Sequence, residues 1–580
     1  MVRWIIKSRD RASRKPNDWV KRLTVAGTLL CSATVNAQGE HKFMVAAANP
    51  HAVDAGYEAL AQGGTAADAA LAVQTVLNLV EPQSSGIGGG LFILYWDAST
   101  STLHTIDGRE TAPASATPGR FLDADGKKLG WWDAVVGGQS VGVPGTIRAL
   151  EITHKLFGRQ SWAAGFDRAI ELSENGFKVS PRLSSSISSA KHLSRFNAAR
   201  DYFFNADGEP LRAGTQLKNP AFAKTLRAIA SRGADAFYTG EIAEQIIAAV
   251  NATSSRTNNI TADDLANYRA KLRAPVCAPY RGYDVCGMGP PTSGGLTVGQ
   301  VLGMLSYFDI AEMGWGPRLA HVLAEAEKRA YADRGLYMAD SDFVLMPTKG
   351  LLDTDYLKSR ASTIEVDKAG PKKAEPGVPP GAQALKLAAG PDRPLAGTSH
   401  FVIRDSYGNA MSVTTTIESG FGSRVMVGGF MLNNELTDFA REPKSKDGRW
   451  VANRVEGGKR PRSSMSPTIV MRRGEPMLLI GSPGGSRIPG YVAQALIGII
   501  DLKMTPQEAV NMGHVMHRNS TSLDVESGTE AEAMAPALAL LGHKVKARKM
   551  ISGIHAIQIN ADGSLTGAAD PRREGTFRGN

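Results

Sequence analysis

Residues 397–417 decide the fold, and they read Gly-Thr-Ser-His-Phe-Val-Ile-Arg-Asp-Ser-Tyr-Gly-Asn-Ala-Met-Ser-Val-Thr-Thr-Thr-Ile. Two runs rich in β-branched residues flank a turn that contains Gly408-Asn409, which predicts a β-hairpin over 400–417. The preceding segment, 364–397, is rich in Pro and Lys and poor in large apolar residues, which predicts an exposed, mobile linker. A linker that meets a buried strand at Gly397-Thr398 is a natural place for chain scission.

The chain before this hairpin mixes strands and helices. The expected elements are a buried strand at 43–48, a helix that opens at Asn49-Pro50, a second helix from Thr65 to about Val80, a strand at 91–96, and mostly helix over 140–265 and 315–340. The Gly-rich loop 84–90 lacks the Gly-Lys-Ser/Thr ending of a phosphate-binding loop. A tight turn with close backbone packing is therefore the better interpretation of that loop.

The composition is that of a globular protein and excludes several classes. The 580 residues are 42% apolar and 21% charged, which rules out a fibrous or wholly disordered chain. The net charge is +10, but residues 1–37 hold eight cations and two anions, so the rest carries only +4 and gives no reason to invoke nucleic acid. No run of eighteen apolar residues occurs, so no stable membrane span is expected.

The first 37 residues resemble an export signal. A basic region that ends at Arg22 precedes an apolar stretch over 23–35. Val35-Asn36-Ala37 then offers small residues at the positions that a signal peptidase reads. We expect cleavage after Ala37 and a periplasmic or secreted protein; the alternative is an uncut N-terminus that anchors the chain to a membrane.

Two cysteines remain once the leader is removed. Cys277 and Cys286 flank a segment that reads as two short strands around a turn. In an oxidising compartment they are either a disulfide or two separate buried thiols. They have no CxxC spacing and no clustered histidines beside them, so neither a metal site nor a cofactor is predicted.

The junction before Thr398 has its own chemistry if the chain is cut there. The new α-amine would lie beside the threonine hydroxyl, and an α-amine with a pKa of about 7.7–8.0 can act as a general base at neutral pH. The hydroxyl would then be a nucleophile without a separate histidine. The alternative is an ordinary threonine at the start of a strand.

Motifs in order along nearly the whole mature chain resemble those of the γ-glutamyltranspeptidase family. The motifs before the junction are Asn49-Pro-His51, Gly63-Gly-Thr-Ala-Ala-Asp-Ala-Ala70, Glu81-Pro82, Ser85-Gly-Ile-Gly-Gly-Gly90, Asp107-Gly-Arg-Glu-Thr-Ala-Pro113 and Pro290-Pro-Thr-Ser-Gly-Gly295. Those after it are Gly397-Thr-Ser-His400, Thr414-Thr-Thr416, Phe421-Gly-Ser423, Leu432-Asn-Asn-Glu-Leu-Thr-Asp-Phe439, Arg460-Pro-Arg-Ser-Ser-Met-Ser-Pro467 and Gly481-Ser-Pro-Gly-Gly485. So many ordered matches make the resemblance highly specific.

The resemblance implies an N-terminal-nucleophile hydrolase. Such a protein is α+β, with a four-layer αββα sandwich, and is made as a precursor that cuts itself into a heterodimer. The implied parts are a signal peptide, 1–37, a large subunit, 38–397, and a small catalytic subunit, 398–580.

The resemblance also implies a role for each matching residue. A threonine nucleophile bonds to a second threonine, and two glycine N–H groups stabilise the developing oxyanion. An arginine and two serines hold the substrate α-carboxylate, and acidic groups hold the α-ammonium. The implied catalytic set is Thr398, Thr416, Gly484 and Gly485, and the implied substrate-binding set is Arg109, Glu418, Glu435, Asp438, Ser463 and Ser464.

Glu418 departs from the family pattern, because well-studied transpeptidases carry Asn at this position to help hold the α-amine. A third carboxylate could bind the ammonium strongly, leave excess negative charge beside the substrate carboxylate, or turn toward Arg487 or another cation. The form Thr-Thr-Thr-Ile-Glu resembles the branch that includes cephalosporin-acylase-like members. It leaves γ-glutamyl specificity, and transfer against hydrolysis, open.

Residues 440–462 correspond to the lid region of some family members. Trp450 falls near the place where those lids carry an aromatic gate. The alternatives for this segment are a lid and a plain surface loop.

The leading hypothesis is an exported γ-glutamyl hydrolase and transferase that acts on glutathione or similar compounds, with water, an amino acid or a peptide as acceptor. The alternative enzyme is a cephalosporin (glutaryl) acylase-like amide hydrolase of the same fold. A non-catalytic exported binding protein is the alternative from another class. The intact set of Thr398, Thr416 and the glycine pair argues against it.

Overall fold

The structure of the protein is a computed structural model that describes residues 42–382, 387–390 and 397–580. The predicted signal peptide, 1–37, lies outside the described residues, as does the end of the predicted linker. In this described part of the chain, no helix is long and apolar enough to cross a membrane.

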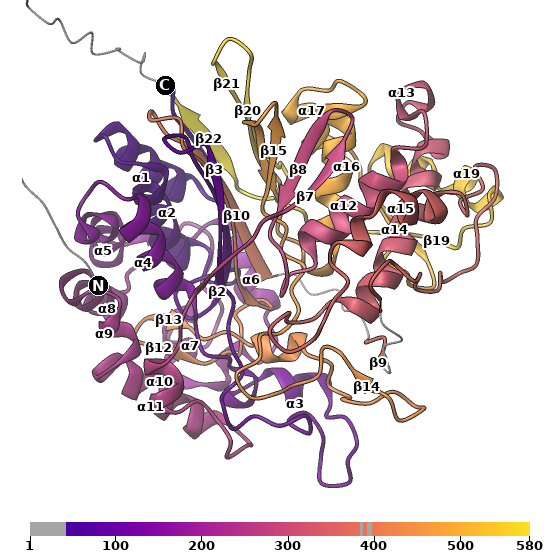
Figure 1. Cartoon of the computed structure of the whole chain (residues 1–580). Coiled ribbons are helices and arrows are strands. Elements are labelled where there is room, and N and C mark those ends of the chain that lie inside the picture. The colour runs from indigo at the N-terminus through magenta and orange to yellow at the C-terminus, as the bar shows by residue number, and fades with distance from the viewer. Residues whose placement is uncertain (1–41, 383–386, 391–396) are drawn as a thin grey trace, which may run out of the picture. The chain divides into compact units, whose positions relative to one another are not determined.

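A seven-stranded antiparallel sheet holds the predicted hairpin (Figure 1). The hairpin consists of β10, Gly397–Arg404, and β11, Ala410–Glu418, so this prediction is confirmed. The order across the sheet is β22 (Thr576–Gly579), β1 (Met44–Ala47), β10, β11, β2 (Gly90–Asp97), β3 (Thr102–Gly108) and β6 (Lys271–Arg273). Strands from both predicted subunits therefore pair directly with one another.

A second antiparallel sheet packs on the first. Its order is β21 (Leu565–Ala569), β20 (His555–Ile559), β16 (Glu475–Gly481), β15 (Thr468–Arg472), β8 (Tyr283–Gly287) and β7 (Val276–Tyr280). The hydroxyl of Ser412 on β11 donates a hydrogen bond to the carbonyl oxygen of Ile480 on β16, at 3.1 Å, and so links the two sheets.

Helices cover the outer face of each sheet (Figure 1). One layer includes α1 (Pro50–Ala61), α2 (Ala66–Val80), α4 (Thr146–Phe157), α5 (Asp167–Asn175) and α8 (Pro220–Arg232). The other includes α12 (Gly294–Leu305), α14 (Pro317–Tyr337), α15 (Thr354–Ala361) and α16 (Ile488–Ile500). The predicted four-layer αββα sandwich is confirmed.

The first sheet is buried on both faces, which explains its continuous apolar strands. On β1, Val45 and Ala47 belong to the core beneath α1 and α2, while Met44 and Ala46 belong to the core that faces the second sheet. Successive side chains of a strand point to opposite faces, so a strand between two cores needs apolar residues throughout.

Smaller elements connect these layers. The remaining helices are α3 (Trp131–Val135), α6 (Pro181–Ser189), α7 (Asn197–Phe203), α9 (Asp235–Tyr238), α10 (Glu241–Thr253), α11 (Ala262–Ala266), α13 (Ile310–Met313), α17 (Pro506–Asn511), α18 (Glu530–Ala533) and α19 (Ala535–Leu540). The short strands are β4 (Phe177–Lys178), β5 (Gln216–Leu217), β9 (Leu387–Ala388), β12 (Met426–Val427), β13 (Phe430–Met431), β14 (Trp450–Val451), β17 (Val515–Met516), β18 (Leu523–Glu526) and β19 (Val545–Arg548).

The predicted helix starts are confirmed. The side chain of Asn49 accepts a hydrogen bond from the N–H of His51 at 3.0 Å, and Thr65 forms a reciprocal capping box with Asp68. The Gly-rich loop also packs as expected. A Cβ on Gly89 would lie 2.0 Å from the carbonyl oxygen of Thr416, so only glycine lets these backbones approach.

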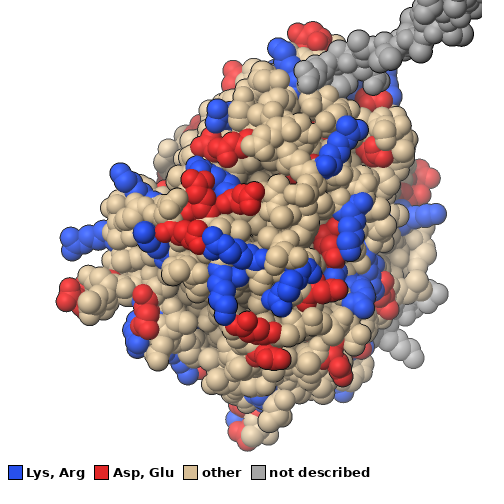
Figure 2. Space-filling model, turned by 90° about the vertical axis from the view of Figure 1, so that its left-hand side faces the viewer, with Lys and Arg blue, Asp and Glu red and all other residues tan. Residues whose placement is uncertain are grey.

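Charges of both signs are interspersed on the face that Figure 2 shows. On α5 and α8, the ion pairs Arg168–Glu171 and Arg227–Glu174 illustrate this mixing. This face carries no large patch of a single sign.

Cys277 and Cys286 form a disulfide in the structure, with an S–S distance of 2.02 Å. They lie opposite one another on β7 and β8, the two predicted short strands. Of the two alternatives, the structure has the disulfide.

The linker prediction needs a correction for residues 370–377, which are held against α14. The ammonium of Lys328 donates to the carbonyl oxygen of Pro371 at 2.8 Å, and the N–H of Gly377 donates to the carboxylate of Asp333 at 2.8 Å. Buried polar side chains on α14 use this segment as their hydrogen-bond partner, a role that composition alone does not reveal.

Candidate active site

Thr398 is the second residue of β10 and lies at a β-bulge. The strand register shifts here, so that Gly397 lies opposite Glu418 and Thr398 opposite Thr416. A Cβ on Gly397 would lie 2.4 Å from the carbonyl oxygen of Glu418, so glycine is required at this position. The residue immediately before the predicted nucleophile, at this bulge, therefore has no side chain.

Thr416 forms hydrogen bonds with the Gly397 carbonyl and with the Thr398 hydroxyl, the two groups that would react in the predicted cleavage. Its hydroxyl donates to the carbonyl oxygen of Gly397 at 2.5 Å and accepts from the N–H of Glu418 at 2.8 Å. The hydroxyl of Thr398 donates to the Thr416 oxygen at 3.4 Å. A donor on the Gly397 oxygen draws electrons from that carbonyl and favours attack on its carbon.

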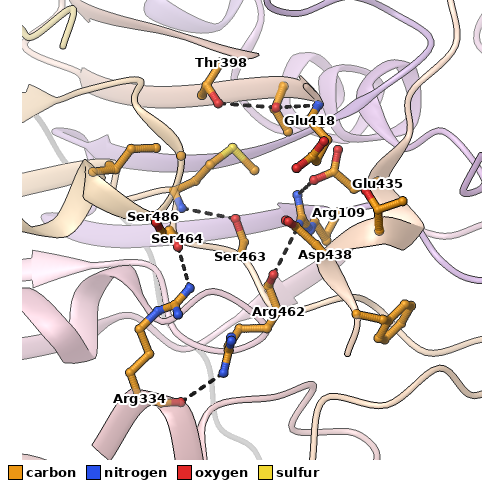
Figure 3. A pocket seen from close by; sticks show the side chains of 16 residues that line it. Arg109, Arg334, Thr398, Glu418, Glu435, Asp438, Arg462, Ser463, Ser464 and Ser486 are labelled. Atoms are coloured by element: carbon orange, nitrogen blue, oxygen red, sulfur yellow. Dashed lines mark hydrogen bonds and ion pairs between the residues drawn. The ribbon is translucent and has the colours of Figure 1, made fainter. Parts of the chain in front are cut away.

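The pocket beside Thr398 brings together most of the predicted site (Figure 3). Nine of the ten predicted residues line it, namely Arg109, Thr398, Thr416, Glu418, Glu435, Asp438, Ser463, Ser464 and Gly485. They come from the end of β3, from the β10–β11 hairpin, from the 3-10 turn Glu435–Asp438 and from the loops before β15 and after β16. The fold therefore gathers motifs that are far apart in the sequence.

Arg109 is buried at one end of this pocket, 1% exposed, and contacts two of the predicted acids. One guanidinium nitrogen donates to Glu435, and the other terminal nitrogen donates to Asp438 at 2.6 Å. Its remaining bonds go to the carbonyl oxygens of Pro461, at 3.1 Å, and Arg462, at 3.2 Å. The predicted grip of Arg109 on a substrate carboxylate remains a prediction.

Three predicted carboxyl groups, those of Glu418, Glu435 and Asp438, line this end of the pocket together with Arg109, and we call it the acidic end. Burial, and then the charge of Asp438, raises the pKa of Glu418 well above its ordinary value. Burial also raises the pKa of Glu435 well above its ordinary value, although Arg109 opposes this shift. Burial therefore favours the uncharged form of the Glu418 and Glu435 carboxyl groups.

Glu110 is a buried acid that the sequence did not single out. Burial raises the pKa of Glu110 to about 7, against the opposing charge of Arg109. Its carboxylate lies 3.9 Å from the guanidinium of Arg109. The only sign in the sequence that pointed to Glu110 was its place in the Asp107–Pro113 motif.

Glu418 joins the acidic end of the pocket. Its carboxylate accepts a hydrogen bond from the side-chain amide of Asn434. Arg487, the cation toward which it was expected to turn as one alternative, instead donates to Asp524 at 3.1 Å. The backbone of Glu418 has a φ of 78°, a left-handed conformation that is costly for a residue with a Cβ.

The opposite end of the pocket carries arginines that the sequence did not predict. Arg334 of α14 donates to the hydroxyl oxygens of Ser464, at 2.5 Å, and Ser293, at 2.8 Å. Arg462 donates to the carbonyl oxygen of Arg334 at 3.2 Å. Both arginines line the pocket (Figure 3). A helical position gave no sign that Arg334 would reach this site.

The glycine pair adopts backbone conformations that favour glycine. Gly484 has a φ of 136° and Gly485 a φ of 60°, just before α16 begins. A Cβ on Gly484 would lie 2.6 Å from the ring of Tyr491. Gly485 lines the pocket, and the oxyanion-hole role of the pair stays a prediction.

The segment 440–462 contains β14, which pairs in parallel with β9. Trp450 is 41% exposed and lies under the cations of Lys444 and Arg454, at 4.5 and 5.2 Å from the ring centre. The structure does not bring Trp450 into the pocket lining, so an aromatic gate stays a prediction.

A second cluster of side chains, away from this pocket, contains His321, Glu325 and His543. The two imidazoles contact each other at 2.7 Å. Glu325 is already paired with Lys328, at 2.6 Å, and Arg329, at 2.7 Å. These two cations disfavour a metal ion at the cluster by charge repulsion.

Comparison with known proteins identifies the relatives of the whole chain. A family model described as gamma-glutamyltranspeptidase matches residues 52–579. The chain is 37% identical over 548 residues to a glutathione hydrolase proenzyme of Bacillus subtilis (strain 168), covering 92% of this chain and 91% of that protein.

Acylases are also similar to this chain. It is 36% identical over 544 residues to an acylase ACY 1 proenzyme of Pseudomonas sp. (strain SE83), covering 92% of each protein. Among solved structures, a cephalosporin acylase from Bacillus halodurans has a TM-score of 0.79 and 26% identity, covering 93% of this chain and 96% of that chain.

Proposed function

The chain belongs to the γ-glutamyltranspeptidase family, and we propose that it is a γ-glutamyl hydrolase and transferase that acts on glutathione and related γ-glutamyl compounds. The observation that carries the proposal is the pocket itself. It sets Thr398 beside carboxyl groups suited to an α-ammonium and beside serines and arginines suited to an α-carboxylate.

The enzyme first cuts its own precursor between Gly397 and Thr398. The Thr398 hydroxyl attacks the Gly397 carbonyl carbon, whose oxygen Thr416 holds at 2.5 Å. The peptide C–N bond breaks, the proton goes to the new α-amine, and an ester joins Gly397 to the Thr398 oxygen. Water hydrolyses the ester and leaves subunits 38–397 and 398–580.

The mature enzyme repeats this chemistry on its substrate. The free α-amine of Thr398 takes the hydroxyl proton, and the oxygen attacks the γ-carbonyl. The leaving amine receives the proton as the γ-glutamyl ester forms. Water, an amino acid or a peptide then accepts the acyl group. N–H groups of Gly484 and Gly485 stabilise the oxyanion in both steps.

Glutaryl amide hydrolysis is the second candidate function. Glu418 favours it, because a raised pKa leaves this carboxyl group uncharged and so weakens its pull on an ammonium. A glutaryl group keeps the carboxylate of a γ-glutamyl group but lacks the ammonium. The similarity to acylase ACY 1 points in the same direction.

Export belongs to the proposal as well. The pattern of residues 1–37 supports cleavage after Ala37 and a periplasmic or secreted enzyme. Mass spectrometry of the mature protein tests this, because an N-terminus near Gln38 is expected and a soluble form that retains Met1 contradicts it.

One assay tests the function directly. The purified, matured protein is given a γ-glutamyl anilide and, separately, a glutaryl anilide, and the specificity constant is measured for each. The proposal expects a clear preference for the γ-glutamyl anilide. A preference for the glutaryl anilide supports the acylase alternative, and inactivity on both rejects the two functions.

A further inference from the structure

The donors of Arg109 are largely occupied within the protein. A guanidinium has five N–H donors. Those of Arg109 already serve Glu435, Asp438 and the two carbonyl oxygens of Pro461 and Arg462. A substrate carboxylate can therefore not receive a full bidentate pair from Arg109 unless a buried ion pair opens. Another donor is needed for this carboxylate.

The two pocket serines are ready to supply donors. The hydroxyl oxygen of Ser463 accepts from the N–H of Met465 at 3.1 Å, and that of Ser464 accepts from Arg334 at 2.5 Å. Because each oxygen is engaged as an acceptor, each hydroxyl proton can be donated into the pocket. A serine polarised by a guanidinium is the stronger donor of the two.

Arg334 is well placed to act through Ser464. It is only 3% exposed and lines the pocket from α14. A second hydrogen bond, to Ser293 at 2.8 Å, orients its planar guanidinium toward Ser464. Figure 3 shows Arg334 on the far side of Ser464 from Thr398, at the opposite end of the pocket from the nucleophile. An acyl group whose reacting carbonyl lies at Thr398 would extend its free carboxylate in this direction.

We propose that Arg334 is a positioning residue that binds the substrate carboxylate through the hydroxyl of Ser464. This inference rests on the proposed function for its substrate, and it extends to every acyl group that carries a free carboxylate, whether γ-glutamyl or glutaryl. In this division of roles, the acidic end selects acyl groups that carry an ammonium group. Arg334 and Ser464 select acyl groups that carry a free carboxylate.

The test separates charge recognition from structural support. Arg334→Met and Arg334→Lys are compared with Arg329→Met, which removes another buried arginine of α14 that pairs with Glu325 at 2.7 Å. Each variant is assayed on a γ-glutamyl anilide and on the matching anilide whose α-carboxylate is a carboxamide.

Arg334→Met is expected to lower the specificity constant for the carboxylate substrate by about 10- to 100-fold, mainly through KM, as for a lost charge-assisted hydrogen bond. The specificity constant for the carboxamide substrate should change much less, because this substrate has no carboxylate charge. Arg334→Lys should recover part of the loss, and Arg329→Met should keep the wild-type ratio of the two substrates. An equal loss on both substrates, or no loss on either, overturns the proposal.

A binding measurement keeps this test independent of catalysis. Glutarate and L-glutamate should raise the melting temperature of the wild-type protein and not that of Arg334→Met, while each unliganded melting temperature reports folding. If the wild type cleaves neither anilide but shows this difference, the proposed function fails and the role of Arg334 stands. If glutarate stabilises both proteins equally, the role of Arg334 is wrong.

Discussion

The β10–β11 hairpin and the walls of the pocket beside it differ in how many tasks their residues perform. Thr416 donates to the scissile carbonyl oxygen of Gly397 at 2.5 Å and accepts from the Thr398 hydroxyl at 3.4 Å. Both threonines also line the substrate pocket. Arg109 contacts Glu435 and Asp438 in the pocket wall, and no contact of these three side chains with the scissile peptide bond is present in the described residues. Changes in the hairpin should therefore stop maturation and turnover together, whereas changes in the walls should affect turnover alone.

The largest expected effect is that of Thr398→Ala, which removes the nucleophile from both reactions. The wild type should give fragments of 360 and 183 residues, about 38 and 19 kDa when scaled from 61.6 kDa for 580 residues. Thr398→Ala should give one uncut band on a denaturing gel and no amide hydrolysis. Thr398→Ser keeps the hydroxyl and should still cut. Two fragments from Thr398→Ala would mean that a separate protease cuts the chain.

Thr416→Val should slow maturation, because it removes the donor to the Gly397 oxygen. Losing one donor to a developing oxyanion costs on the order of 100- to 1,000-fold in rate. Thr415→Val is a matched control, because the neighbouring Thr415 is also buried on β11 and its hydroxyl has no hydrogen-bond partner among the described residues. The rate of precursor disappearance after synthesis measures the effect. Equal rates for the two variants would remove Thr416 from the mechanism.

Arg109→Ala should mature normally and then bind γ-glutamyl substrates poorly. Arg109 holds Glu435 and Asp438, and its loss takes positive charge from the pocket. We expect the specificity constant to fall by a factor that corresponds to about 1.5–3 kcal/mol of lost transition-state binding. A gel reports maturation and steady-state kinetics report binding. A failure to mature, in a protein that still folds, would break the division between hairpin and walls.

The sequence predicted the hairpin better than the pocket walls. Runs rich in β-branched residues and a Gly-Asn turn are local signals, so β10 and β11 could be predicted directly. The resemblance to the family supplied nine of the residues that line the pocket. Arg334 escaped notice because α14 brings it to Ser464 only through tertiary packing. The left-handed backbone of Glu418 was not predicted either, since Glu418 lies opposite Gly397 at a register shift that local sequence does not reveal.

Substitutions of Glu418 should have the smallest effect. This residue lines the pocket and is also the last residue of β11 in the hairpin. Its φ of 78° suits Asn better than Glu, so Glu418→Asn should stabilise the fold by about 1 kcal/mol, while Glu418→Gln should keep the backbone strain. Both variants should cut normally. Both should also change γ-glutamyl preference over glutaryl, with Asn raising it if the extra acid blurs specificity.

The effect of pH on Glu418 has a definite sign. Burial and Asp438 raise the folded-state pKa of Glu418 above 4.5, so the folded protein keeps this proton while the unfolded chain loses it. The wild type therefore loses stability as pH rises from about 4.5 toward the raised pKa. The stability of Glu418→Gln relative to the wild type should increase over the same range, because glutamine does not titrate. Thermal unfolding of both proteins between pH 4 and pH 8, in roughly half-unit steps, measures this difference. A constant difference across that range would show that Glu418 ionises in the folded protein as it does in the unfolded chain, and would contradict its raised pKa.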